Sequence, residues 1–206
     1  VATLRPNEGI FGGAVAVEEG TENLVTNFDL SSWSSHSLTN VERNYLGDYM
    51  TKIEAVGSVS SSPRVFRVLS NISAGDVVTF SAYIKSSKSM YMNIRTGSDG
   101  ATGNYEIVSR EIYKSNQIRR CSVTAQITQQ DLDSGYAGIS FLFRFAHFDE
   151  GDWAIVGRPQ IEIKPFATSP VNGTSPDGIL AYPISLADDH TIACYRKSHT
   201  DEGYKH

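Results

Sequence analysis

Residues 77–85 read VVTFSAYIK, and this stretch decides the fold because apolar and polar side chains alternate along it. Successive side chains of a β-strand point to opposite faces of a sheet. One face of the stretch therefore carries Val78, Phe80, Ala82 and Ile84, and the other face is more polar. The alternation predicts a strand whose apolar face packs in the core of the protein.

The same alternation recurs on both sides of this stretch. Short runs rich in β-branched and aromatic residues occupy residues 14–18, 50–56, 65–70, 90–96, 118–127, 137–148 and 153–164. Gly, Ser, Asn and Asp cluster between these runs, as at residues 73–76, 97–100, 133–135 and 149–152, and they favour tight turns. No amphipathic helix of ordinary length competes with the strands. The sequence therefore predicts an all-β fold, an antiparallel β-sandwich of the jelly-roll type.

The domain organisation follows from a change of composition near residue 170. We expect residues 1–13 to be an N-terminal extension and residues 14–170 to form the jelly roll. Residues 171–178 are rich in turn formers and predict a linker. Residues 179–206 contain two more strand-like runs, 179–186 and 191–196, which cannot bury a core of their own. They either dock on the first domain or are the truncated start of a second β-sandwich.

Composition excludes several classes of function. The 206 residues include 18 Lys and Arg against 23 Asp and Glu, a net charge of -5, which argues against binding to nucleic acid. No apolar run approaches the roughly 18 residues of a membrane span, and residues 1–6 show no signal peptide. The five His residues are scattered without zinc-ligand spacing, and Cys121 and Cys194 are expected to be reduced.

One outward-facing stripe has the chemistry of a sugar site. Tyr91, Asn93 and Arg95 share the face of residues 90–96 that points away from the core. Aromatic faces pack on sugar rings, and planar polar groups bind sugar hydroxyls. We expect Arg120 and Arg144 to be neighbours on the same sheet. An ordinary solvated face explains the stripe equally well.

Trp33, with Tyr45 and Tyr49, lies in a loop-rich segment that could overhang this site. The competing interpretation, more common for large aromatic residues, places Trp33 and Trp153 in the core.

Catalysis has weak support in the sequence. Glu106 and Glu111 are close together, and Asp149, Glu150 and Asp152 form an acidic turn, where carboxylates usually stay hydrated. Nucleophile elbow, phosphate-loop and HExxH motifs are all absent from the sequence. The protein is therefore expected not to be an enzyme, and glycan hydrolysis is the least favoured of its candidate functions.

Two segments carry a family resemblance. Residues 11–27 read FGGAVAVEEGTENLVTN and are followed by Trp33, and residues 157–169 read GRPQIEIKPFATS. Together they resemble the carbohydrate-binding-module-like jelly rolls of phage and prophage tail or tail-fibre proteins, over about residues 11–175. Residues 178–206, which include TIACYR at 191–196, resemble the beginning of a concanavalin-like or laminin-G-like sandwich.

The resemblance implies a function and a set of partners. It implies a non-catalytic carbohydrate-binding module that recognises a host cell-surface or cell-wall glycan. Its other partners would be virion tail subunits, and its location would be the virion or the extracellular space, without membrane insertion. A structural virion spacer or assembly module that binds no sugar is the alternative.

The resemblance also implies a structural calcium ion that joins the first strand to the last. Glu18, Glu19, Asn23, Asp29 and Glu162 are the candidate oxygen ligands, and calcium takes six to eight oxygens. The chain lacks the Asp-Asp pair expected in the last strand of the xylanase-type modules. The alternative is that these side chains are solvated or cap strand ends.

Overall fold

The computed structural model describes residues 2–6, 13–17, 21–25, 30–36, 39–47, 49–59, 62–97, 105–134, 138–146, 148–168, 174–175, 183–185 and 191–193. The chain divides into two compact units. The larger is Asn23–Asn172, and the smaller combines Val1–Glu22 with Gly173–His206.

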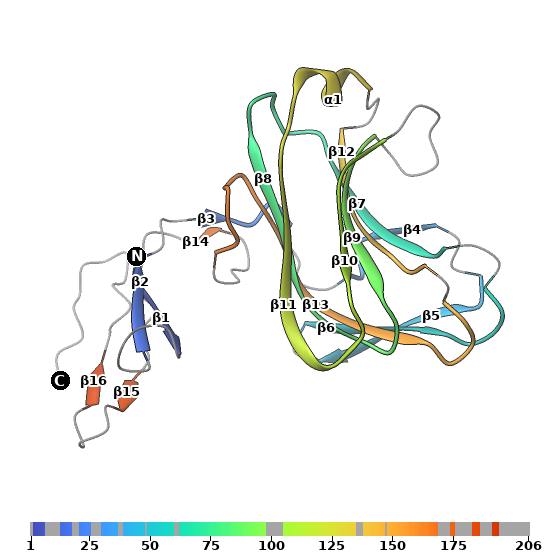
Figure 1. Ribbon diagram of the computed structural model, residues 1–206, viewed down its shortest axis with the longest axis horizontal. Helices are drawn as coiled ribbons and strands as arrows, with labels where there is room; N and C mark the ends of the chain where they lie inside the picture. Colours follow the sequence, from blue (N-terminus) through green and yellow to red (C-terminus); the bar gives the residue numbers. More distant parts are fainter. Residues whose placement is uncertain are drawn as a thin grey trace. The chain divides into compact units, whose positions relative to one another are not determined.

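The larger unit is a sandwich of two five-stranded antiparallel sheets that face each other (Figure 1). We name each sheet after a central strand. The β9 sheet has the order β10 (Glu106–Ile112), β9 (Met90–Thr96), β12 (Ile139–Arg144), β7 (Arg64–Leu69) and β4 (Ser34–His36). The β8 sheet has the order β11 (Ser115–Gln126), β8 (Val77–Ser86), β13 (Trp153–Glu162), β6 (Met50–Ala55) and β5 (Val41–Gly47). This confirms the predicted all-β antiparallel sandwich.

The core lies between the two sheets and follows the alternation in the sequence. The predicted inward residues of β8, from Val78 to Ile84, are at most 2% exposed. Phe80 lies at the centre of an aromatic cluster, with its ring centroid 4.9 Å from that of Phe143 and 5.8 Å from that of Phe141. Such contacts stabilise the core beyond the area that they bury.

Trp33 belongs to this core and does not overhang a binding site. It is 2% exposed, and its ring stacks on Phe80 at 5.9 Å and on Phe143 at 5.6 Å. Burying the large apolar ring of Trp33 is more favourable in free energy than leaving it exposed in a loop. The interpretation that places Trp33 in the core is therefore correct. Trp153 is half-buried in β13.

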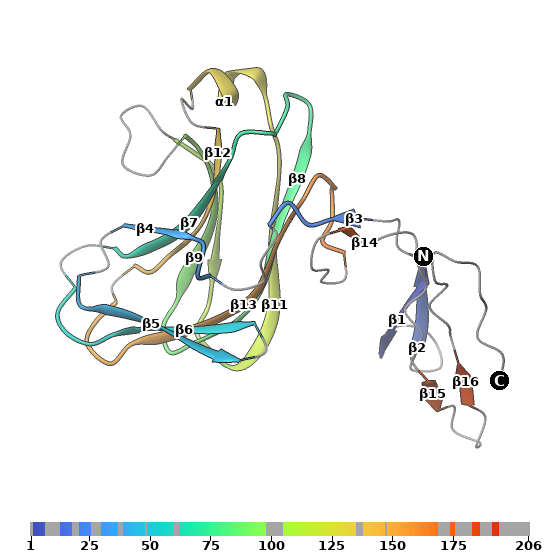
Figure 2. The same ribbon diagram turned by 180° about the vertical axis from the view of Figure 1, so that it is seen from behind.

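The sequence did not predict β4, β5, β10 or the short helix α1 (Gln129–Ser134), which closes one end of the sandwich (Figures 1 and 2). β4 and β5 lie at sheet edges, as does β10, and most of their side chains are exposed. An edge strand needs no apolar alternation, which removes the signal that identifies a strand. No helix in the described part of the chain is long and apolar enough to cross a membrane.

The described residues of the smaller unit form three antiparallel strand pairs. β1 (Ala2–Pro6) pairs with β2 (Gly13–Val17), and β3 (Thr21–Glu22) pairs with β14 (Thr174–Ser175). β15 (Pro183–Ser185) pairs with β16 (Thr191–Ala193). The predicted strand at 14–18 therefore exists as β2 but pairs outside the sandwich. The assignment of residues 179–206 to the start of a second sandwich stays a prediction.

Candidate functional site

The outward face of the β9 sheet carries the predicted binding residues, and we call it the polar face. Its side chains come from all five strands and form rows across the sheet, because residues opposite one another in an antiparallel pair lie side by side. The first row is Glu111, Tyr91, Arg144, Arg64 and His36. The second is Ser109, Asn93, Leu142, Phe66 and Ser34, and the third is Glu106, Arg95, Ser140 and Val68.

Tyr91 and Arg144 form the most distinctive contact of the polar face. They lie opposite each other on β9 and β12, and the guanidinium carbon of Arg144 is 4.6 Å from the centre of the Tyr91 ring. Both side chains are half-buried. Arg144 has no hydrogen-bond or ion-pair partner among the described residues, and its Nε is buried. A guanidinium has five N–H donors, and the four on the two Nη atoms of Arg144 have no partner among the described residues.

Asn93 lies on this face, as predicted, but its side chain is at the floor of the face and not at its surface. It is fully buried, and its Nδ2 donates to Ser109 Oγ at 2.8 Å and to Glu106 Oε2. It therefore positions two side chains of β10. The third residue of the predicted stripe, Arg95, is half-buried and lies opposite Glu106 and Ser140.

Arg120 does not join the other predicted residues, because β11 belongs to the β8 sheet. Its guanidinium donates to Ser81 Oγ at 3.0 Å and lies 5.7 Å from the centre of the Tyr83 ring. Strand alternation tells which residues of one strand share a face, but it does not tell which of two sheets a strand joins. The expectation that Arg120 neighbours Tyr91 was wrong for this reason.

Sequence reasoning did not assign three residues to the polar face, although it had considered one of them, Glu111, as a catalytic carboxylate. Arg64 and Phe66 are half-buried and alternate with the inward residue Val65 of β7. Glu111 lies opposite Tyr91 and is exposed. The alternation in residues 64–69 was the available signal for Arg64 and Phe66, and no comparable signal marked the edge strand that holds Glu111.

The acidic turn at residues 149–152 is an ion-paired turn. Asp149 N donates to Asp152 Oδ2 at 2.8 Å, which closes the turn. Lys88 Nζ pairs with Asp152 Oδ2 at 2.9 Å and with Asp149. Hydrogen bonds to Asp149 and Asp152 raise the pKa of Lys88. The carboxylates of Asp149 and Asp152 are therefore paired with the Lys88 ammonium, which is typical of carboxylates with a structural role.

The proposed calcium ligands are only partly described. Asn23 Oδ1 accepts from the backbone N–H groups of Val25 and Ile161, each at 3.0 Å, and thus joins the start of the larger unit to β13. Glu162 is buried, and its two oxygens accept from Thr168 N at 3.1 Å and from Thr168 Oγ1. These two residues therefore take part in a clasp of protein hydrogen bonds.

The rest of the predicted calcium site cannot be placed. Glu18, Glu19 and Asp29 lie outside the described residues. Within the described residues, no group of three or more His, Cys, Asp or Glu side chains is arranged to hold a metal ion. Of the two cysteines, Cys121 is buried and free, burial raises its pKa, and Cys194 is not described.

Comparison with known proteins supports the fold. No protein-family model matches the chain, and no curated protein matches it. Among solved structures it resembles the carbohydrate-binding module CBM4, with a TM-score of 0.50 and 7% identity over 66% of this chain and 89% of that one.

It also resembles the enzymatically active domain of tailspike protein 4 of bacteriophage CBA120, with a TM-score of 0.51 and 11% identity over 69% of this chain. The match spans 21% of the tailspike chain. A further similar structure, TmCBM61 bound to β-1,4-galactotriose, has a TM-score of 0.47 and 13% identity over 69% of this chain and 99% of that one. The two antiparallel sheets, together with the likeness to CBM4, show that the sandwich is of the jelly-roll type.

Proposed function

We propose that the polar face binds a glycan and that the chain is a non-catalytic carbohydrate-binding module of a phage-type tail or tail-fibre protein. The observation that carries this proposal is the pair of Tyr91 and Arg144. It places a half-exposed aromatic ring beside a guanidinium that has no hydrogen-bond partner among the described residues.

The surroundings of the pair suit a sugar chain. The apolar face of a pyranose ring packs on an aromatic ring, and planar donors and acceptors bind its hydroxyls. Glu111 provides an acceptor on one side of Tyr91, and Arg64 places a second guanidinium on the far side of Arg144. Phe66 offers a second aromatic surface in the neighbouring row. These groups stand on paired strands, which hold them in place before a ligand arrives.

The comparisons support the same proposal at the level of the fold. A sandwich like CBM4 is suited to carbohydrate binding, although a fold does not by itself determine function. The tailspike match supports a virion setting, in which the glycan would be on the host surface. Virion tail subunits are then the other expected partners.

The proposal is tested with a glycan array that includes bacterial cell-wall polysaccharides, followed by calorimetry on the glycans that bind. We expect Tyr91→Ala and Arg144→Ala each to weaken binding by about 10-fold or more, as loss of a buried aromatic or Arg contact does. Tyr113→Ala is the matched control, because Tyr113 is 67% exposed and lies in the turn between β10 and β11. Binding that is unchanged in both variants would refute the polar face as the site.

The second candidate function is a structural module of the virion that binds no sugar, which the tailspike resemblance also accommodates. Analytical ultracentrifugation, together with the glycan array, distinguishes the two candidate functions. A spacer or assembly module predicts a defined oligomer and no signal on the array, whereas the glycan-binding module predicts binding that depends on Tyr91.

A further inference from the structure

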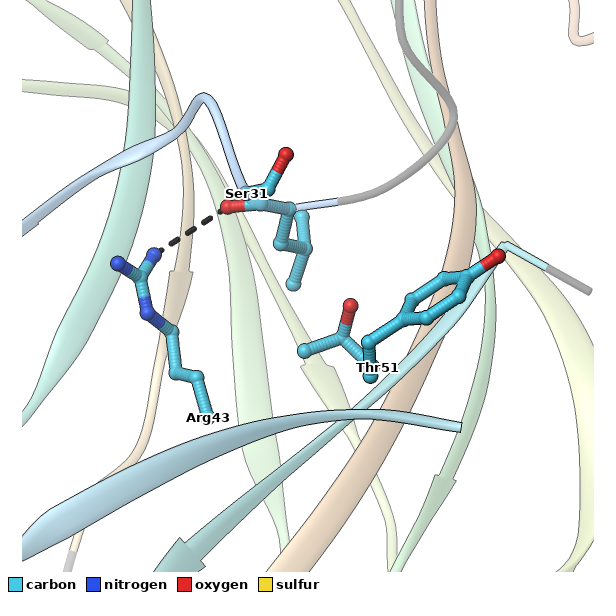
Figure 3. A pocket seen from close by; sticks show the side chains of 5 residues that line it. Ser31, Arg43 and Thr51 are labelled. Carbon is cyan, nitrogen blue, oxygen red and sulfur yellow. Dashed lines mark hydrogen bonds between the residues drawn. The ribbon is translucent and has the colours of Figure 1, made fainter. Parts of the chain in front are cut away.

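A hollow at the edge of the β8 sheet has no role in the function proposed above. Its volume is about 290 Å³, and it is lined by Leu30, Ser31, Arg43, Tyr45 and Thr51 (Figure 3). Arg43 and Tyr45 come from the edge strand β5, and Thr51 comes from its neighbour β6. The polar face belongs to the other sheet, so the hollow is a separate place on the protein.

Arg43 is the charged group of the hollow, and the backbone fixes its position. Its Nη1 donates to the carbonyl oxygens of Leu30 at 3.2 Å and Trp33 at 3.1 Å. The guanidinium has three further N–H groups, and these have no partner among the described residues. No ion pair in the described part of the chain involves Arg43. A positive charge is therefore held at the hollow, and no carboxylate of the described residues pairs with it.

The other groups supply a flat surface and hydroxyls. Tyr45 is 59% exposed, and its hydroxyl accepts a hydrogen bond from Tyr49 N at 3.2 Å, which holds the ring at the rim. Thr51 is 5% exposed, and its hydroxyl has no partner among the described residues. In Figure 3, the Thr51 hydroxyl and the Arg43 guanidinium both extend from the strands toward Ser31.

We infer that this hollow is a second binding site and that it takes a sugar ring bearing a carboxylate, such as a hexuronic or sialic acid residue. The planar guanidinium of Arg43 matches a carboxylate, with which Arg forms paired hydrogen bonds. Tyr45 packs on the ring, and the hydroxyls of Ser31 and Thr51 bind ring hydroxyls. The volume is close to the lower end of the roughly 300–1,000 Å³ of ligand pockets, which suits one ring and not a long chain.

The test is an NMR titration of the whole chain with a trimer of galacturonic acid and with the same trimer after reduction of its carboxyl groups. We expect the acidic trimer to shift the Arg43 Nε–H signal and the amide signals of Tyr45 and Thr51. We expect the neutral trimer to bind at least 10-fold more weakly at these signals, because the charged hydrogen bonds are lost.

Variants separate the hollow from the polar face. Tyr45→Ala leaves the bonds of Arg43 intact and is expected to weaken binding of the acidic trimer about 10-fold, while Thr51→Val removes only a hydroxyl and is expected to weaken it several-fold. Arg43→Lys keeps the charge and loses the paired geometry, so it is expected to weaken binding as well. Tyr113→Ala and Tyr91→Ala are the controls and should leave these shifts unchanged.

Three outcomes would overturn the inference. They are no shift at Arg43, Tyr45 and Thr51, equal shifts with both trimers, and shifts confined to the surroundings of Tyr91 and Arg144. The last outcome would leave the polar face as a glycan site, so it refutes the second site alone. If the glycan array showed no binding that depends on Tyr91, the proposed function of the polar face would fail, but the inference about the hollow would still stand.

Discussion

Gly138 shows at the residue scale how closely the start of β12 approaches the end of its neighbour β7. It precedes β12 with a φ of 109°, a conformation that L side chains rarely adopt. A Cβ atom at this position would lie 2.2 Å from the carbonyl oxygen of Leu69, at the end of β7. The carbonyl oxygen of Gly138 also accepts from Gly97 N at 2.7 Å. Only glycine fits between these backbone segments.

We therefore predict that Gly138→Ala destabilises the protein by more than about 3 kcal/mol, from backbone strain together with a steric clash. Gly75→Ala is the control, because Gly75 has a φ of 95° but no atom within 4 Å of the added Cβ. It should cost only the strain, on the order of 1 to 2 kcal/mol. Urea unfolding followed by circular dichroism measures both, and equal losses would contradict the clash.

At the same scale, prediction from sequence succeeded where one strand decides the outcome. The alternation around Tyr91 placed Tyr91, Asn93 and Arg95 on one outward face, and this is what the structure shows. It did not indicate that Asn93 would be covered by its neighbours, because depth on a face depends on adjacent strands. It also did not exclude Arg120 from this face, because the sheet that a strand joins depends on its pairing with strands far away in the sequence.

At the scale of elements, helix α1 depends on a capping arrangement formed by Thr128 and Asp131. Thr128 Oγ1 accepts from Asp131 N at 3.2 Å, and Asp131 Oδ2 accepts from Thr128 N at 2.7 Å. This is a capping box in which Asp replaces the usual Glu. The buried carboxylate of Asp131 also accepts from the Tyr105 hydroxyl, which ties the helix to the chain before β10.

We predict that Asp131→Asn lowers stability at pH 7 by about 1 to 2 kcal/mol, as loss of a cap does. Burial alone would raise the pKa of Asp131, but hydrogen bonds from Tyr105 and Thr128 outweigh it, so the pKa is lowered. A lowered folded-state pKa contributes stability above the ordinary value of about 3.9, and this is lost as the pH falls through the folded-state value. The gap between variant and native protein should therefore shrink below about pH 4.

Urea midpoints at pH 7, 5 and 3 measure this gap. Asp133→Asn is the matched control, because Asp133 is exposed on the same helix and accepts from Gln129 Nε2 at 2.8 Å. A gap that stays constant across the three pH values would show that the charge of Asp131 does not contribute.

At the scale of the whole molecule, the hydrogen bonds of Asn23 tie the start of the larger unit to β13, its last strand, and Glu162 on β13 accepts from Thr168. Leu24 N also donates to Ile161 O at 2.9 Å, so backbone and side-chain bonds act together there. We expect EDTA to change the unfolding temperature by less than about 2 °C, which corresponds to under ~1 kcal/mol at this size. A rise of several degrees on adding calcium would instead support the predicted site with Glu18, Glu19 and Asp29.

The larger unit should fold by itself, because the described buried hydrophobic residues all lie between Val25 and Ile161. We predict that residues 23–172 alone unfold in one cooperative transition, within about 3 °C of the corresponding transition of the full chain, since deletion of the smaller unit removes none of the described core residues. Differential scanning calorimetry on both chains measures this. In the short chain, Asn23→Ala should lower the transition by several degrees, because it leaves the buried Ile161 N–H without its acceptor. A short chain without a cooperative transition would mean that the sandwich depends on the strand pairs outside it.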